Sequence, residues 1–131
     1  MTTTATEQIS AVSVINMLGE IVDGHEDYVY DTELGCVYFD GSGAPSCLVG
    51  HVLAAYGYTS SLVEGVPGTQ GLSANASRIT WVAQRLHLPF SPGAVTVLDE
   101  AQYAQDQRYS WGEAYARAAR WYETMCESGT P

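Results

Sequence analysis

The feature that most constrains the fold is the apolar run from Cys47 to Tyr56, which reads Cys-Leu-Val-Gly-His-Val-Leu-Ala-Ala-Tyr. It contains no charged residue when His51 is neutral. On a helix, its apolar residues would lie on all sides rather than along one stripe, as they do in helices that other elements surround. We therefore predict a central buried helix over residues 46–56.

Apolar residues at spacings of three and four predict further helices around this one. For the first, the expected core residues are Ala11, Val14, Ile15, Leu18 and Val22. Capping residues mark where the helices begin, because their side chains accept hydrogen bonds from backbone N–H groups of the first turn. The predicted helices begin at a capping box (Thr4-x-x-Glu7), at about Ser73 (ending near Leu86), at Ser91 followed by Pro92, and at a second capping box (Ser110-x-x-Glu113).

Two runs of β-favouring residues predict one short β-hairpin over residues 28–39. Tyr28-Val29-Tyr30 and Cys36-Val37-Tyr38-Phe39 are separated by a five-residue loop. Two strands alone are marginally stable, so the hairpin must pack on helices. The expected fold class is α+β and mostly α, with about five helices, in a single globular domain over residues 1–131. Residues 58–73, rich in glycine, form a long connection that is either functional or mobile.

The charge of the chain restricts its partners. It has five arginines, no lysine and fifteen acidic residues, which gives a formal net charge of −10. Because nucleic acids and anionic membranes are bound through Lys and Arg, we expect no direct nucleic-acid binding and no membrane association. No apolar run is long enough to span a membrane, and no signal-peptide pattern is visible, so the expected location is the cytoplasm. The expected partner is a protein with a basic surface.

Three interpretations compete for Cys47 and His51, which share a helix face. In the first, Cys36, Cys47 and His51 bind zinc together with a fourth ligand such as His87 or Cys126. In the second, Cys47 is a thiolate nucleophile at a helix N-terminus and His51 is its base. In the third, which we favour, Cys47, Gly50 and Ala54 form a small-residue strip that lets another helix approach, and His51 hydrogen-bonds a backbone carbonyl or a side chain.

An acidic cluster lies between the first helix and the predicted hairpin. It lacks the ligand spacing of a calcium-binding loop, and its plainest interpretation is a solvated helix end and loop. A weak metal site at Asp23-x-His25-x-Asp27 is a further alternative. If the cluster is functional, we expect it to bind a protein together with the nearby tyrosines, since aromatic residues supply contact area at interfaces. The predicted surface consists of Glu20, Asp23, Glu26, Asp27, Tyr28, Tyr30, Asp31, Glu33 and Tyr38.

The remaining aromatic residues and motifs suggest structure rather than chemistry. Helical spacing predicts that Trp81, Trp111, Trp121 and Tyr122 belong to the core. The sequence contains no glycine-rich phosphate loop, no Gly-x-Ser-x-Gly and no His-Glu-x-x-His, so no cofactor is expected.

The segment from Cys36 to Tyr56 resembles a group of small actinobacterial and actinophage proteins, in which a Cys-bearing strand precedes a Cys-Ile/Leu-Ala/Val-Gly-His/Trp helix. The segment 86–90 is similar to a Leu-Gly-Leu segment in that group. In those proteins the first Cys usually lies in a Cys-Gly-Thr context, whereas here Cys36 is followed by Val37. The resemblance implies a source in a high-GC bacterium or its phage, and little about chemistry.

Taken together, these patterns favour a small acidic protein-binding domain, such as a phage-encoded inhibitor or regulator of a host protein, over an enzyme. The first alternative is a zinc-binding domain that uses Cys36, Cys47 and His51. The second alternative is a thiol-dependent enzyme that uses Cys47 and His51.

Overall fold

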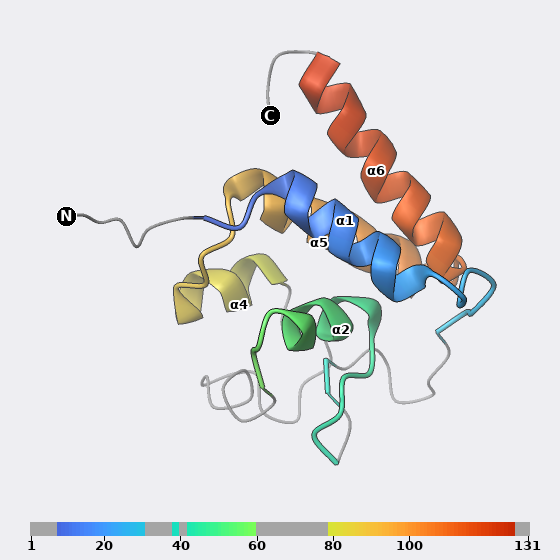
Figure 1. The fold of residues 1–131 in the computed structure, drawn as a ribbon, viewed down its shortest axis with the longest axis horizontal. Helices are drawn as coiled ribbons and strands as arrows, with labels where there is room; N and C mark the ends of the chain where they lie inside the picture. Colours follow the sequence, from blue (N-terminus) through green and yellow to red (C-terminus); the bar gives the residue numbers. More distant parts are fainter. Residues whose placement is uncertain (1–7, 31–37, 40–41, 60–78, 128–131) are drawn as a thin grey trace.

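The computed structural model describes residues 8–30, 38–39, 42–59 and 79–127, and within these ranges the chain is mostly helical. Figure 1 shows the helices assembled around α5, with α6 projecting past one end of the others. The described helices are α1 (Ala11–Val22), α2 (Leu48–Ala55), α4 (Ile79–Leu86), α5 (Pro92–Asp106) and α6 (Trp111–Glu127). None of them is long and apolar enough to cross a membrane.

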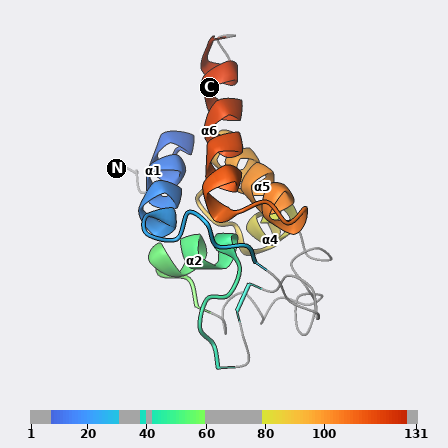
Figure 2. The same ribbon diagram turned by 90° about the vertical axis from the view of Figure 1, so that its right-hand side faces the viewer.

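Helix α5 occupies the centre of this assembly. It packs against α6, α1, α4 and α2 in turn, whereas α2 packs mainly against α1 and α5 (Figures 1 and 2). The prediction that residues 46–56 form the central helix is therefore wrong for the described part of the chain. The physical reason is that α5 is nearly twice as long and carries small buried residues on its packed face, among them Ala94, Ala101 and Ala104, which let neighbouring helices approach closely.

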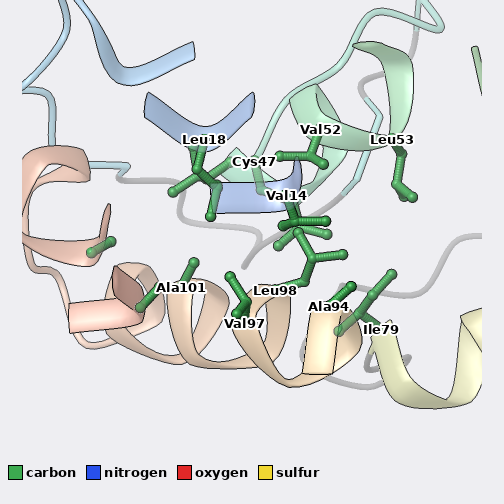
Figure 3. Close-up of a cluster of buried hydrophobic side chains, with 14 of the residues drawn as sticks. Val14, Leu18, Cys47, Val52, Leu53, Ile79, Ala94, Val97, Leu98 and Ala101 are labelled. Atoms are coloured by element: carbon green, nitrogen blue, oxygen red, sulfur yellow. The ribbon is translucent and has the colours of Figure 1, made fainter. Parts of the chain in front are cut away.

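Helix α2 is nevertheless well buried. Leu48, Val49, Val52 and Leu53 are inaccessible to solvent, and the helix is flanked by Cys47 as its N-cap. Figure 3 shows apolar side chains of the core pointing toward one another, with labelled residues from α1, α2, α4 and α5. Those that it labels are Val14, Leu18, Cys47, Val52, Leu53, Ile79, Ala94, Val97, Leu98 and Ala101.

The start of α1 differs from the prediction, although its buried face does not. The N-cap is Ser10, whose side chain accepts a hydrogen bond from the Ser13 N–H at 3.1 Å. Thr4 and Glu7 lie outside the described residues. All five residues predicted to face the core from this helix are buried, which confirms the amphipathic pattern. The chain leaves the helix through Gly24, whose φ of +85° is a conformation that glycine adopts readily.

Both later capping signals are confirmed. Ser91 accepts a hydrogen bond from the Ala94 N–H at 3.1 Å, and Pro92 is the first residue of α5. Ser110 accepts from the Glu113 N–H at 3.2 Å at the start of α6. Serine caps of this kind satisfy donors that a helix cannot pair internally.

The predicted hairpin over residues 28–39 is not confirmed. Its loop and most of its second strand, residues 31–37, lie outside the described residues. The described ends form isolated bridges to other segments: Val29 pairs with Ser110, and Phe39 pairs with Pro45. Most of the connection 58–73 also lies outside the described residues.

Gly50 has a different role from the one predicted. A Cβ at this position would overlap the backbone carbonyl oxygen of Tyr38, so the close neighbour of α2 is a loop backbone rather than another helix. The same carbonyl accepts a hydrogen bond from the Ser46 N–H at 2.9 Å. Only glycine leaves room for this approach, which explains a residue that is otherwise unfavourable inside a helix.

One aromatic residue predicted to be in the core is at the surface. Trp81 is 36% exposed, and the Arg85 guanidinium lies 5.5 Å from its ring centroid. Trp111 is buried as predicted, and Trp121 and Tyr122 are half-buried against the core.

Candidate functional site

A pocket of about 500 Å³ lies where the end of α1, the start of α2 and the start of α6 meet. This volume is within the range of about 300–1,000 Å³ found for small-ligand pockets. Its wall combines aromatic rings, two histidines and three hydroxyl groups, and within the described part of the chain no Asp, Glu, Lys or Arg lines it. The lining residues are Ile21, His25, Tyr28, Tyr30, Pro45, Ser46, His51 and Trp111.

The segment that carries His25 and Tyr28 is fixed by the N-terminus of α6. The N–H of Trp111 donates to the Tyr28 carbonyl at 2.8 Å, and the N–H of Gly112 donates to the Glu26 carbonyl at 3.0 Å. Two first-turn donors of the helix are thus satisfied by this segment rather than by water. A side chain at Gly112 would press on the Glu26 backbone, so glycine permits the approach.

Trp111 forms one wall of the pocket, and two other rings meet it at steep angles. The ring centroid of Tyr28 lies 4.8 Å from that of Trp111, with an interplanar angle of 81°. The ring centroid of His51 lies 5.3 Å away, with an angle of 72°. Edge-to-face packing of this kind is favourable for aromatic side chains and holds the rings in different planes.

A buried glutamine sets the position of this wall. The Gln105 Oε1 atom accepts hydrogen bonds from the Trp111 indole N–H at 3.2 Å and from the Leu48 backbone N–H at 2.8 Å. Leu48 is the first residue of α2, so one amide oxygen from α5 joins the starts of α2 and α6. Sequence reasoning missed Gln105, because nothing in the local pattern distinguishes it from an exposed helical glutamine.

His51 has a defined tautomer when it is neutral. Its Nδ1 atom lies 3.0 Å from the Cys47 carbonyl oxygen. A carbonyl oxygen can only accept, so Nδ1 carries the proton and Nε2 has a free lone pair. Among the described residues, no group hydrogen-bonds to Nε2. The prediction that His51 bonds to a backbone carbonyl is confirmed.

Cys47 is fully buried, and its sulfur accepts a hydrogen bond from the Gly50 N–H at 3.4 Å. A nucleophile must contact its substrate, so this position suits packing and helix capping better than the thiol chemistry of the second alternative. Within the described ranges, no group of three His, Cys, Asp or Glu residues could hold a metal ion. Cys36 lies outside those ranges, as does the side chain of Cys126, so the zinc alternative stays a prediction.

Two hydroxyl groups of the pocket lining, those of Tyr30 and of Ser46 in the segment before α2, lie close together. Tyr30 Oη and Ser46 Oγ are 2.8 Å apart and share one hydrogen bond. The Ser46 hydroxyl is thus paired with a phenol rather than with a histidine base, which is not the arrangement of an activated serine nucleophile.

The acidic residues Glu20, Asp23, Glu26 and Asp27 are all exposed, as a binding surface requires. The Glu26 carboxylate accepts a hydrogen bond from the Gly24 N–H at 3.2 Å. Hydrogen bonds from its own backbone N–H and from that of Gly24 lower the pKa of Glu26, with a smaller contribution from His25.

The tyrosines of the predicted surface divide into two groups. Tyr28 is 47% exposed and Tyr30 is half-buried, and both line the pocket. Tyr38 is only 5% exposed, so its side chain belongs to the core and does not contribute to an exposed surface. Asp31 and Glu33 lie outside the described residues.

The pocket brings together residues that sequence reasoning had treated separately. The sequence places His25 in the acidic cluster, pairs His51 with Cys47 and predicts a core position for Trp111. Their meeting depends on tertiary packing, for which no local signal exists. No family model matches the chain, and the searches of curated proteins and of solved structures also found no match.

Proposed function

We propose that this chain is a protein-binding domain that contacts a basic partner through the surface around residues 20–30 and the adjacent pocket. The observation that supports the proposal is the position of four exposed carboxylates on the same segment that supplies His25 and Tyr28 to the pocket wall. The negative charge that would attract a basic partner and the concave wall that would contact it therefore lie on the same segment.

The two parts of this surface would contribute differently to binding. Exposed carboxylates attract a basic partner over distance and chiefly raise the association rate. A partly exposed tyrosine beside a concave wall supplies buried contact area, which is where most of the binding free energy of an interface is concentrated. The surface therefore combines a means of attracting the partner with a means of holding it.

The test compares two charge-reversed variants of equal net charge. The first is Asp23→Lys with Asp27→Lys, on the proposed surface. The second is Glu100→Lys with Glu123→Lys, on α5 and α6. Each immobilised protein is exposed to an extract of an actinobacterium, to which the sequence resemblance directs the search, and the retained proteins are quantified by mass spectrometry.

We expect the unaltered protein and the α5/α6 variant to retain the same specific protein, and the Asp23/Asp27 variant to lose it with little change in melting temperature. Retention should also fall with added salt, because exposed charges are screened. Equal retention by both variants, or no specific retention by the unaltered protein, would contradict the proposal.

A further inference from the structure

The charge environment of the pocket favours a positively charged occupant. Among the residues that the structure describes, no Lys or Arg lines the pocket. On either side of the lining residue His25, the chain carries the exposed carboxylates of Asp23, Glu26 and Asp27. A cation that enters the pocket is therefore attracted by the surrounding field and meets no fixed positive charge on the described lining residues.

The rings of the pocket favour the same kind of occupant. Tyr28 and His51 both stand at steep angles to Trp111, so the lining presents aromatic groups in more than one plane. The faces of Tyr and Trp rings are electron-rich and attract cations within about 6 Å of the ring centre. A flat cation can pack against one ring while its edge reaches polar atoms on another wall.

The polar atoms of the lining can act as acceptors. His51 Nε2 offers a lone pair, since Nδ1 donates to the Cys47 carbonyl. The Ser46 hydroxyl shares one hydrogen bond with the Tyr30 hydroxyl, and a hydroxyl oxygen has two lone pairs, so the Ser46 oxygen can accept a further hydrogen bond. The ligand that matches this lining is planar, positively charged and rich in N–H donors.

We propose that the pocket receives the guanidinium group of an arginine side chain from the partner protein, an inference that rests on the function proposed above. A guanidinium is planar, carries five N–H donors, is weakly hydrated and stacks on aromatic faces. The ammonium group of lysine is compact and strongly hydrated, so it would lose more hydration and gain fewer hydrogen bonds in the same space. Arginine is therefore preferred to lysine.

The test uses blocked amino acids as probes and the full chain as receptor. N-acetyl-arginine amide is titrated while NMR follows the ring signals of Tyr28, His51 and Trp111. The matched probes are the citrulline compound, which has the same shape without the charge, and the lysine and phenylalanine compounds. We expect the arginine probe to shift these signals at a concentration at least tenfold lower than any other probe, which corresponds to about 1.4 kcal/mol.

A pair of tyrosine variants locates the binding. Tyr28 and Tyr103 are both well exposed, at 47% and 63%, but only Tyr28 lines the pocket. Tyr28→Leu should weaken binding of the arginine probe at least threefold, whereas Tyr103→Leu should leave it unchanged. The His51→Phe variant, which keeps a ring but removes the acceptor, should also weaken binding, and circular dichroism verifies that each variant is folded.

The outcomes separate this inference from the proposed function. Equal binding of arginine and citrulline, tighter binding of phenylalanine, or no arginine binding would overturn the guanidinium assignment. The protein-binding proposal would then still stand if the Asp23/Asp27 variant loses a partner that the α5/α6 variant keeps. Arginine binding at Tyr28 without any retained protein would instead support a cation pocket and contradict the protein-binding proposal.

Discussion

Replacing Gln105 with methionine should destabilise the protein far more than its single side chain suggests. Methionine has a similar length but cannot accept the two hydrogen bonds that Oε1 receives. The Leu48 N–H and the Trp111 indole N–H would both stay buried without partners. A buried donor left without its partner costs about 1–3 kcal/mol, so the expected loss in the free energy of unfolding for the two donors is about 2–6 kcal/mol.

The assay is equilibrium unfolding in urea, with the free energies extrapolated to water. Gln84→Met is the matched control, because Gln84 is exposed on α4, and it should change stability by no more than about 0.5 kcal/mol. In a Trp111→Phe background, which removes the indole donor, Gln105→Met should cost about 1 kcal/mol less than in the natural background.

Two results would refute this reasoning. One is a Gln105→Met variant that is as stable as the Gln84→Met control. The other is a cost for Gln105→Met that is the same with and without the Trp111 indole donor, since the indole would then not depend on the glutamine.

Two further predictions concern the surroundings of α2. Gly50→Ala should destabilise the protein by about 2 kcal/mol or more, because the new methyl group would overlap the Tyr38 carbonyl. The control is Gly19→Ala, whose methyl group would meet only the tip of the Tyr115 side chain. Thermal unfolding should show that Gly19→Ala is the milder change. An equal effect of both substitutions would contradict the close approach. Burial raises the pKa of Tyr58, so this side chain stabilises the fold below the ordinary tyrosine pKa of about 10, and that stabilisation is lost as the pH rises through the higher pKa of the folded protein. Ultraviolet titration against Tyr58→Phe should show that the tyrosinate signal missing from the variant forms at a higher pH than the signals of the exposed tyrosines. A Tyr58 that ionises with the exposed tyrosines would refute the burial argument.

Local signals in the sequence were sufficient for much of the helical structure. The starts of α5 and α6 are predicted correctly from Ser91 with Pro92 and from Ser110, because a capping residue acts within a single helical turn. The apolar stripe of α1 was readable for the same reason. The predicted start of α1 is wrong because Thr4-x-x-Glu7 and Ser10 both satisfy capping preferences, whereas the observed helix begins at Ala11 with Ser10 as its N-cap.

The arrangement of the helices and the pocket could not be read in this way. A helix that is apolar all round, such as α2, indicates burial but not which neighbours cover it. The contacts of Gly50 with Tyr38, and of Gln105 with Leu48 and Trp111, join different elements of the fold, and Leu48 is 57 positions from Gln105 in the chain. Trp81 is a wrong prediction of burial. Its helical spacing suits a core position, but its side chain is partly exposed and lies beside the Arg85 guanidinium.

The distribution of the pocket along the chain has a consequence for stability. Ile21, Pro45 and Trp111 line one cavity although ninety positions separate the first from the last. No isolated fragment contains the complete wall, so the cavity comes into existence only when the chain has folded. By thermodynamic linkage, any occupant that prefers the complete wall joins distant parts of the chain and stabilises the native state, by about 2.7 kcal/mol at a concentration one hundred times its Kd.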